Sequence, residues 1–312
     1  MSGSAAGARG TGIRNEQPTM KIPFDSPPSP TRPRLAFVLG SGGVRSIAAV
    51  GIAERLAREG IVPDLIVGCS SGALFGATIA MGMSSDEALR SATSLWSAEL
   101  TQQRRWLAYA QLLAPKLAGF DADFALRDDR LIAQRISRAF GDRRLEGLRI
   151  PLRVVATDAQ SGDPVVLSRG PLVAALRASM AVPFIFPSIE VEGRRLVDGV
   201  ISDPLPLGAA RDAEVIIALG FIGTMPRRID RPSRMVAQTS TTLINNLMQA
   251  RLAAARANGQ RVINIELGLA RKVGLWETAA MPDMFDAGRR AAESRLPEIV
   301  ALLGRAPARN AA

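Results

Sequence analysis

Two short apolar runs, each followed by a turn rich in small residues and a helical stretch, constrain the fold of this chain more than any other feature. The first run is Arg-Leu-Ala-Phe-Val-Leu at residues 34–39, followed by Gly-Ser-Gly-Gly at 40–43 and a helical pattern over 44–59. The second run is Asp-Leu-Ile-Val-Gly at residues 64–68. This order predicts a strand–helix–strand unit and therefore an α/β fold.

The second apolar run continues without a charge over residues 65–82, which is long enough to suggest a membrane span. Its first third is β-branched, a cluster of Gly and Ser interrupts it, and its remainder is rich in Ala. These features favour a buried strand followed by a buried helix, so we expect no membrane span here. Ser-Ser-Asp-Glu at 84–87 predicts a capping box that starts the next helix.

The rest of the chain alternates between apolar runs and helical periods. Strands are predicted at 152–157, 165–167 and 214–219, a hairpin at 191–197 with Gly193 in its turn, and helices at 171–181, 234–258 and 283–303. Residues 34–304 are interpreted as one domain. Residues 1–33, rich in Gly, Ser, Pro and Arg, and residues 305–312 are predicted to be a disordered leader and tail. The leader lacks the apolar core of a secretory signal, so we expect no export.

Two scarce residue types exclude classes of chemistry. The chain has no His and a single Cys, Cys69, so it forms no intramolecular disulfide and offers only carboxylates as protein metal ligands. Ordinary zinc sites are excluded, and neither a metal nor a cofactor is predicted. The scarcity of Cys fits a reducing compartment. We expect a cytoplasmic protein with peripheral contact at the inner membrane face.

The charge of the chain favours contact with anions. There are 39 Lys and Arg against 29 Asp and Glu, a net charge of +10, and only Lys21, Lys116 and Lys272 are lysine. Guanidinium groups suit phosphates, either in nucleic acid or on an anionic membrane. The Arg residues are spread along the chain and aromatic residues make up only 4%, so a solvated basic surface is the simpler interpretation. No nucleic-acid partner is expected, although a basic nucleic-acid-binding protein is kept as an alternative.

The sequence Gly-Cys-Ser-Ser-Gly at 68–72 has the spacing of a nucleophile elbow, with Ser70 at its centre. In such an elbow the nucleophile lies at a sharp strand-to-helix turn, the flanking residues Gly68 and Gly72 avoid clashes, and the helix directs its N-terminus at an oxyanion. The same pattern also arises by chance in chains rich in Gly and Ala. The predicted strand before it and helix after it favour the elbow.

The turn at residues 40–43 also lies between a predicted strand and a predicted helix, so its amides can converge on an anion. The alternative, a dinucleotide-binding loop, fails because position 45 is Arg and no acidic residue ends a second strand about 20 residues later. At the carboxyl ends of adjacent parallel strands, this turn and the elbow would share one crevice.

Without His, the base that activates Ser70 must be a carboxylate or a lysine. The three lysines lie in the leader or lack the context of a site, whereas Asp198 follows the predicted hairpin and precedes Gly199. Asp198 is therefore the predicted base, although an Asp-Gly pair alone is more typical of a plain turn. An ordinary Asp, with a pKa of about 3.9, is a weak base, so geometry and a dry oxyanion hole must contribute much of the catalysis.

Together these residues resemble the patatin-like phospholipase family, in particular its small bacterial members. Its G-G-G-x-R-G motif is matched by residues 41–46, its G-x-S-x-G motif by 68–72, and its D-G-[GA] motif by 198–200. The resemblance implies a three-layer α/β/α fold with a mainly parallel central sheet, and a serine esterase of the phospholipase A or lysophospholipase type that degrades lipids. It implies Ser70 as nucleophile, Asp198 as base, the amides of Gly42 and Gly43 as oxyanion hole, and Arg45, Gly68, Gly72 and Gly199 as supporting residues.

Three positions depart from the family motifs. Ser41 and Ser46 replace glycines, and Val200 replaces Gly or Ala, so we expect changed loop torsions or a changed pocket width. The alternative function that these departures suggest is a catalytically idle scaffold or regulator with the same fold. Cys69 is expected to point into the fold as a small buried residue.

Enzymes of this family that act on bulk lipid must meet a membrane. Trp96, Trp106 and Tyr109 lie near Arg104 and Arg105, a mixture suited to the depth of lipid headgroups, and they suggest an interfacial lip. The alternative is that the aromatic residues pack inside helices. The sequence leaves the acyl substrate and the oligomeric state open.

Overall fold

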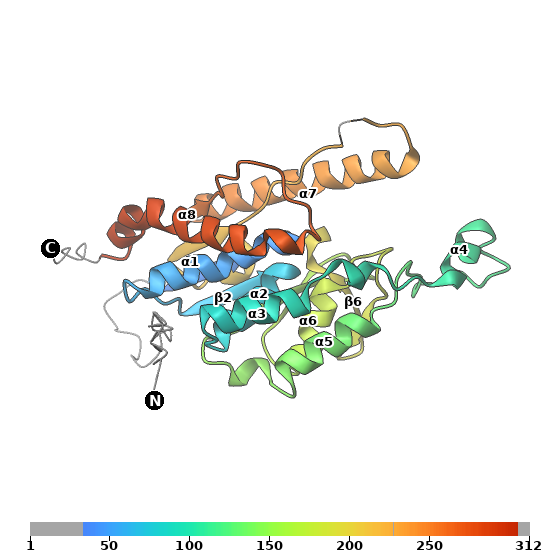
Figure 1. The fold of residues 1–312 in the computed structure, drawn as a ribbon, viewed down its shortest axis with the longest axis horizontal. Coiled ribbons are helices and arrows are strands. Elements are labelled where there is room, and N and C mark those ends of the chain that lie inside the picture. Colours follow the sequence, from blue (N-terminus) through green and yellow to red (C-terminus); the bar gives the residue numbers. More distant parts are fainter. Residues whose placement is uncertain (1–33, 227, 305–312) are drawn as a thin grey trace, which may run out of the picture.

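The computed structural model describes residues 34–226 and 228–304. In these ranges eight strands form one sheet in the order β5-β6-β3-β2-β1-β7-β8, with β4 also paired to β3. The strands are β1 Leu35–Leu39, β2 Leu65–Cys69, β3 Leu152–Asp158, β4 Pro164–Leu167, β5 Ile189–Val191, β6 Arg194–Asp198, β7 Val215–Leu219 and β8 Arg261–Ile265. The α-helices are α1 Ala48–Ala57, α2 Ser71–Ala80, α3 Ser85–Leu95, α4 Trp106–Leu113, α5 Arg130–Phe140, α6 Leu172–Met180, α7 Pro232–Ala257 and α8 Met281–Leu302 (Figure 1).

The central strands are buried on both faces, and helices cover both faces. Strands β3, β2, β1, β7 and β8 are parallel to their neighbours in that series. Leu35, Phe37 and Leu39 of β1 pack in one cluster with side chains of α1, α2 and α8, whereas Ala36 and Val38 pack on the opposite face with α7. The predicted three-layer α/β/α fold with a mainly parallel central sheet is thus confirmed.

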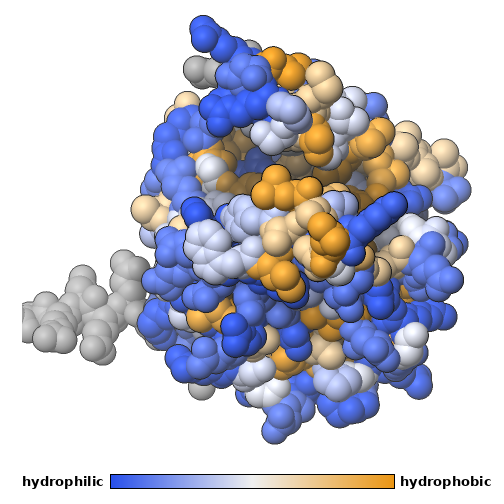
Figure 2. Space-filling model, turned by 90° about the vertical axis from the view of Figure 1, so that its right-hand side faces the viewer, coloured by the Kyte–Doolittle hydropathy of each residue, from blue (hydrophilic) through white to orange (hydrophobic). Residues whose placement is uncertain are grey.

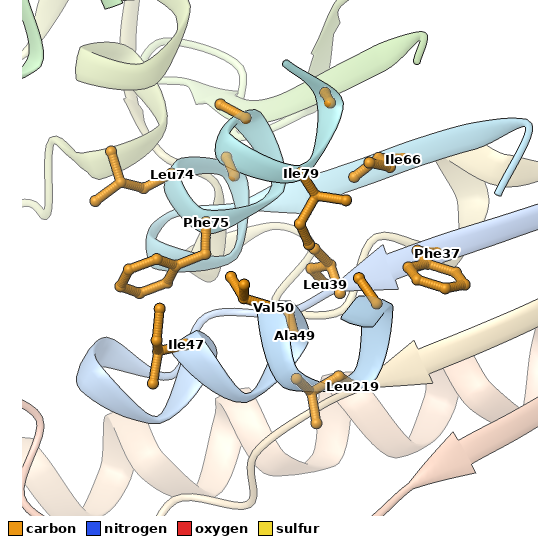
Figure 3. Close-up of a cluster of buried hydrophobic side chains, with 14 of the residues drawn as sticks. Phe37, Leu39, Ile47, Ala49, Val50, Ile66, Leu74, Phe75, Ile79 and Leu219 are labelled. Atoms are coloured by element: carbon orange, nitrogen blue, oxygen red, sulfur yellow. The ribbon is translucent and has the colours of Figure 1, made fainter. Parts of the chain in front are cut away.

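The largest of the three buried apolar clusters includes the region where α1 and α2 cover β1 and β2. Figure 3 shows Phe75 of α2 and Ile47 turned toward each other beside Leu74, with Leu39 and Ile66 contributed by the strands. All five side chains have at most 3% of their surface exposed. This packing fixes the starts of α1 and α2 relative to the ends of the strands that precede them.

Most of the predicted elements are present. Residues 65–82 contain β2 and α2, as expected, and no helix in the described part of the chain has the length and apolarity needed to cross a bilayer. The predicted capping box starts α3, because Ser84 Oγ accepts a hydrogen bond from the Glu87 amide while the Glu87 carboxylate accepts one from the Ser84 amide. The hairpin of β5 and β6 turns at Glu192 and Gly193, both with positive φ. The predictions for residues 1–33 and 305–312 fall outside the described residues.

Strand β3 brings two distant strand ends together along one of its edges. Cys69, the last residue of β2, is paired with Val155, and Asp198, the last residue of β6, is paired with the next residue, Ala156. Strand β4 pairs with both of these β3 residues and so occupies the opposite edge. Because β2 is parallel and β6 antiparallel to β3, their carboxyl ends point at each other.

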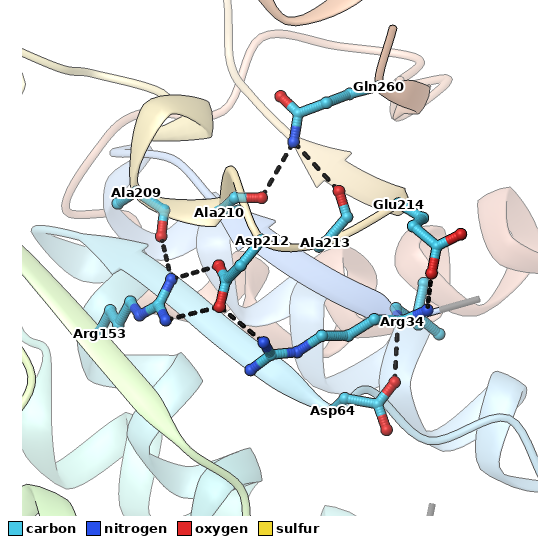
Figure 4. Close-up of polar contacts among 10 residues, drawn as sticks. Arg34, Asp64, Arg153, Ala209, Ala210, Asp212, Ala213, Glu214 and Gln260 are labelled. Carbon is cyan, nitrogen blue, oxygen red and sulfur yellow. Dashed lines mark hydrogen bonds and ion pairs between the residues drawn. The ribbon is translucent and has the colours of Figure 1, made fainter. Parts of the chain in front are cut away.

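The opposite end of the sheet, where the strands begin, is held by charged side chains (Figure 4). Arg153 makes a bidentate contact with Asp212 at 2.6 and 2.8 Å, and Arg34 Nη1 lies 2.7 Å from the same carboxylate. The amide of Leu35 donates to Asp64 Oδ2 at 2.8 Å, which ties the start of β1 to the residue before β2. The hydrogen bonds from Arg153 lower the pKa of Asp212, so the cluster stays charged at neutral pH.

Candidate active site

Ser70 lies at a sharp turn between β2 and α2. Its backbone has φ 55° and ψ −126°, a conformation that non-glycine residues rarely adopt, and only 5% of its surface is exposed. The flanking glycines are required by space. A Cβ on Gly68 would lie 2.4 Å from the Cα of Ala73, and a Cβ on Gly72 would lie 2.3 Å from the carbonyl oxygen of Leu39. The predicted elbow is therefore formed, with Ser70 at its centre.

The structure brings Ser70 and Asp198 into direct contact. Ser70 Oγ donates a hydrogen bond to Asp198 Oδ2 at 2.7 Å, and the other carboxylate oxygen accepts one from the Val200 amide at 2.8 Å. A Cβ on Gly199 would lie 2.5 Å from the carbonyl oxygen of Val155, so only glycine lets the chain turn this close to β3. The adjoining ends of β2 and β6 thus position both side chains through the register of the sheet.

Burial determines the electrostatics of the pair. Asp198 has no exposed surface, and the loss of solvation raises its pKa from 3.8 to about 7, against the opposing effect of the hydrogen bonds from Ser70, Val200 and Cys69. A carboxylate with a pKa near neutrality is a stronger base than an ordinary Asp, yet a large fraction of it is ionised at pH 7. The weakness of Asp as a base, expected from the sequence, is therefore much reduced in this environment.

The two amides predicted to form the oxyanion hole point at a neighbouring hydroxyl group. The amides of Gly42 and Gly43 donate to Ser71 Oγ at 3.0 and 2.8 Å. Since this oxygen already accepts two hydrogen bonds, its own proton is directed to Ser46 Oγ at 2.9 Å, which in turn donates to the carbonyl oxygen of Gly40 at 3.4 Å. The departure from the family motif at Ser46 is thus accommodated by a buried hydroxyl chain.

Two other backbone amides beside Ser70, those of Ser71 and Gly72, are available to bind an anion. The amides of Ala73 and Leu74 donate to the carbonyl oxygen of Ser70. The amides of Ser71 and Gly72, the first two residues of α2, have no acceptor among the described residues, as expected at a helix N-terminus. They lie directly after Ser70, and the dipole of α2 favours negative charge there.

Arg45 and Phe221 hold the glycine-rich loop in place. Arg45 Nε donates to the carbonyl oxygen of Gly42 at 3.1 Å, and its guanidinium lies 4.9 Å from the centre of the Phe221 ring. A Cβ on Gly42 would lie 2.2 Å from that ring, and Gly43 has φ +61°. Burial lowers the pKa of Arg45. Through these contacts Arg45 helps to order the glycine-rich loop.

Two residues that support the site were not identified from the sequence. Ser179 of α6 accepts a hydrogen bond from the Ser70 amide at 2.8 Å and donates one to the carbonyl oxygen of Val155 at 2.6 Å, which fixes the strained backbone. Thr157 of β3 donates to the carbonyl oxygen of Asp198 at 2.9 Å. Neither residue belongs to a local pattern, so only the packing of α6 and β3 reveals its contact.

Cys69 is fully buried, as expected, and its Sγ lies 3.9 Å from Asp198 Oδ1. Burial and the neighbouring carboxylate raise the pKa of its thiol, so it stays protonated. No group of three or more Cys, Asp and Glu side chains within residues 34–226 and 228–304 is arranged to hold a metal ion.

The aromatic residues of the expected interfacial lip are divided between the core and the surface. Trp96 is 6% exposed and stacks on Trp276 with 4.5 Å between ring centres. The expectation that Trp96 belongs to the interfacial lip is therefore wrong, and this side chain packs inside the fold, as the alternative stated. Trp106 and Tyr109 of α4 are 74% and 37% exposed. They remain candidates for contact with a partner surface.

Comparisons with known proteins find relatives in sequence and in structure. A protein of Mycobacterium tuberculosis named as an uncharacterised NTE family protein is 36% identical over 219 residues, covering 67% of this chain and 57% of that protein. Patatin-like phospholipase domain-containing protein 7 of Rattus norvegicus is 32% identical over 192 residues, covering 59% of this chain and 13% of that protein. The crystal structure of VipD from Legionella pneumophila aligns over 85% of this chain and 67% of that chain, with 14% identity and a TM-score of 0.42.

This chain therefore spans little more than half the length of the mycobacterial relative and a small part of the rat protein. The sequence profile of the family described as patatin-like phospholipase matches residues 37–211, which include the elbow, the glycine-rich loop and Asp198. The chain belongs to the patatin-like phospholipase family.

Proposed function

We propose that this protein hydrolyses carboxylic esters of lipids, with Ser70 as nucleophile and Asp198 as general base. The observation that carries the proposal is the 2.7 Å hydrogen bond between Ser70 Oγ and a buried carboxylate, made at a strained strand-to-helix turn. Membership of a phospholipase family supports lipids as the substrate class. Phospholipids and lysophospholipids are the expected substrates. We expect the enzyme to be cytoplasmic and to make peripheral contact at the inner membrane face.

The proposed reaction follows from the contacts of the dyad. Ser70 Oγ attacks the acyl carbon while its proton passes to Asp198 Oδ2, and the oxyanion is stabilised by the open amides of Ser71 and Gly72. The intermediate then expels the alcohol, which takes the proton from Asp198. Water attacks the acyl-enzyme and gives a proton to Asp198; release of the fatty acid returns that proton to Ser70.

The glycine-rich loop has a defined part in this proposal. The amides of Gly42 and Gly43 are held by Ser71 Oγ in the resting site. They contribute to the oxyanion hole when the developing negative charge competes with the hydroxyl oxygen as acceptor, since an anionic acceptor makes the stronger hydrogen bond.

The proposal predicts that both members of the dyad are required for turnover. Ser70→Ala is expected to lower kcat/KM by at least about 10³-fold and to abolish labelling by a fluorophosphonate probe, because the nucleophile is lost. Asp198→Asn is expected to lower kcat/KM by about 10²–10⁴-fold, because the general base is lost. The assay uses a panel of phospholipid, lysophospholipid and p-nitrophenyl esters.

Asp203→Asn is the matched control for the base. Asp203 is a second buried carboxylate whose pKa burial raises to about 6, but it faces Arg251 rather than Ser70. Its variant should keep the label and most of the activity. Asp198→Asn turning over esters as fast as wild type would eliminate Asp198 as the base.

The two alternatives give different results in simple assays. A catalytically idle scaffold, suggested by Ser41, Ser46 and Val200, would leave the wild-type protein unlabelled by the probe. A nucleic-acid-binding protein, suggested by the net charge of +10, would bind DNA with an affinity that falls steeply with salt. We expect probe labelling and no such DNA binding.

A further inference from the structure

Helix α4 projects from the body of the protein (Figure 1). Its sequence, Trp-Leu-Ala-Tyr-Ala-Gln-Leu-Leu, is apolar on nearly all sides. Only Ala108 and Gln111 of its eight residues are buried. Leu113 is 89% exposed and Leu117, just beyond the helix, is 92% exposed. We name residues 104–123 the α4 projection. Single exposed apolar side chains are ordinary in a folded protein, but a protruding helix with apolar side chains gathered at its tip marks an interaction surface.

A second exposed apolar group lies on the N-terminal part of α7 and the loop before it. We name residues 221–226 and 228–243 the α7 projection. Both projections lie at the right-hand end of the molecule in Figure 1. Figure 2 faces that end and shows apolar surface above and below a hollow. The exposed apolar side chains of the α7 projection are Ile222, Met225, Ile229, Met235, Val236 and Leu243.

The α4 projection is joined to the candidate base by a short series of backbone hydrogen bonds. The amide of Asp198 donates to the carbonyl oxygen of Ala181 at 2.9 Å. Phe184 follows Ala181 by three residues, and its carbonyl oxygen accepts a hydrogen bond from the amide of Leu126. The carbonyl oxygen of Leu126 in turn accepts one from the amide of Arg105. The base of the projection therefore borders the half of the site that contains Asp198.

The α7 projection is joined to the other half of the site. The ring of Phe221, its first residue, packs directly on Gly42 and lies beside Arg45. Two residues later, Gly223 and the side-chain amide of Asn245 exchange two hydrogen bonds of 2.8 and 3.0 Å, which fasten this loop to α7. The site thus lies between the two projections, on the side of the sheet where the strands end.

The charges on the projections favour an anionic partner. The α4 projection contains Arg104, Arg105 and Lys116 against Asp121 and Asp123, and Lys116 is the charged residue nearest its apolar tip. On the α7 projection Asp230 already pairs with Arg231 and Arg234, and Arg228 adds a further positive charge. Apolar side chains beside an excess of positive charge suit the headgroup region of an anionic bilayer. A second copy of this chain would carry the same net charge of +10 and would be repelled.

We propose that the two projections dock together on the surface of an anionic lipid bilayer, so that the hollow between them opens onto lipid. The apolar residues of α4 enter the boundary between headgroups and acyl chains, and the Arg and Lys side chains meet lipid phosphates. The biological purpose of the docking rests on the proposed function, but the docking itself is independent of catalysis. Its test can therefore be separated from the test of the hydrolase.

The experiment measures co-sedimentation of the full chain carrying Ser70→Ala, so that lipid is not consumed. Vesicles consist of phosphatidylcholine alone or of an equal mixture of phosphatidylcholine and phosphatidylglycerol. We expect binding to the anionic vesicles that weakens with salt, and at least a tenfold loss of affinity on addition of Leu113→Ser with Leu117→Ser, or of Met235→Ser with Val236→Ser. Val166→Ser is the matched control, because Val166 is 45% exposed and belongs to neither projection.

Three results overturn the docking proposal. They are no binding to either type of vesicle, full binding by both paired variants, and a change in oligomeric state on substitution of Leu113 and Leu117 with vesicle binding unchanged. The last would identify a second copy of the chain as the partner. Circular dichroism confirms that each variant is folded.

A soluble ester distinguishes this failure from a failure of the proposed function. With Ser70 intact, p-nitrophenyl butyrate should be hydrolysed equally by wild type and by the Leu113→Ser, Leu117→Ser variant, while hydrolysis of vesicle lipid falls in the variant. Ester turnover without vesicle binding rejects the docking and keeps the hydrolase. Vesicle binding without any turnover or probe labelling rejects the hydrolase and keeps the docking.

Discussion

At the scale of single residues, the site depends on the exclusion of water from one carboxylate. Asp198 is fully buried, and in the proposed mechanism its pKa of about 7 allows it to take the part that His plays in many serine hydrolases. Ser70 and Asp198, which the structure brings into contact, could both be selected from the sequence because each lies in a short local pattern. The roles of Ser71 and Ser179 could not, because their contacts depend on how the glycine-rich loop and α6 pack around Ser70.

The raised pKa of Asp198 predicts how activity and stability vary with pH. Since the ionised form is the base, kcat/KM should rise with pH through about 7 and level off above it. Below about pH 4 Asp198 is protonated in both the folded and the unfolded chain. Between about pH 4 and 7 Asp198 keeps its proton only in the folded chain. The free energy of unfolding therefore falls as pH rises through this range, by on the order of 4 kcal/mol in total.

Asp198→Asn tests the stability side of this prediction. The variant should be more stable than wild type in urea unfolding, with a difference that grows from pH 4 to pH 7 and stays constant above. Asp203→Asn separates the two buried carboxylates, since the limb of the activity profile near pH 7 should persist in it. A difference between Asp198→Asn and wild type that does not vary with pH would contradict the raised pKa.

Ser71 is predicted to stabilise the glycine-rich loop. Ser71→Ala leaves the buried amides of Gly42 and Gly43 without their acceptor, so the free energy of unfolding should fall by about 1–3 kcal/mol. Urea denaturation measures the change. Ser46→Ala is the control and should cost less, because Ser71 still accepts both amides. Equal stability of the two variants would show that the amides find another acceptor.

At the scale of elements, most strands and α-helices were predicted from their apolar patterns, but β8, α4 and α5 were not. Strand β8 was not predicted, because Arg261–Ile265 is a short edge strand paired only with β7. Helix α4 was not predicted either, because its apolar residues face almost every direction and leave no period to detect. Helix α5 was not predicted either, although Ile132, Ile136 and Phe140 recur at helical spacing and are buried on one face.

Helices α1 and α8 approach each other through two glycines. A Cβ on Gly51 would lie 2.1 Å from the carbonyl oxygen of Phe285, and one on Gly288 would lie 2.1 Å from that of Ala48. Gly51→Ala and Gly288→Ala should each lower the free energy of unfolding by about 1–3 kcal/mol, because the helices must move apart. Thermal unfolding measures the effect.

Gly147→Ala is the control for these two variants, because no atom lies within 4 Å of a Cβ added at Gly147. The free energy of unfolding of this variant should equal that of wild type. The double variant should lose less than the sum of the single losses, because one separation of the helices relieves both clashes. Single variants as stable as wild type would show that α1 and α8 pack less closely than described.

At the scale of the whole molecule, the fold extends beyond the residues that the family profile matches. The family profile ends at residue 211, yet β7, α7, β8 and α8 complete the sheet and its cover after that point. The predicted domain of residues 34–304 therefore extends well beyond the family motifs. We propose that this segment is a complete folding unit.

A shortened chain of residues 34–304 tests that proposal. Its melting temperature should lie within about 2 °C of that of the full chain, and it should keep the fluorophosphonate label, because all three buried apolar clusters and the site lie inside it. A chain of residues 40–304, which lacks the central strand β1, is the control and should not fold. A poorly soluble or unlabelled 34–304 chain would show that the excluded segments contribute to the fold.

The shared edge of β3 also determines when the candidate site can assemble during refolding. Ser70 and Asp198 are 128 positions apart in the chain, and each is placed by a different strand that must first join β3. Helices can regain their structure early from local contacts, but Ser70 meets Asp198 only after both strands have joined. The rate at which the fluorophosphonate probe labels Ser70 during refolding should therefore report how fast the sheet is completed.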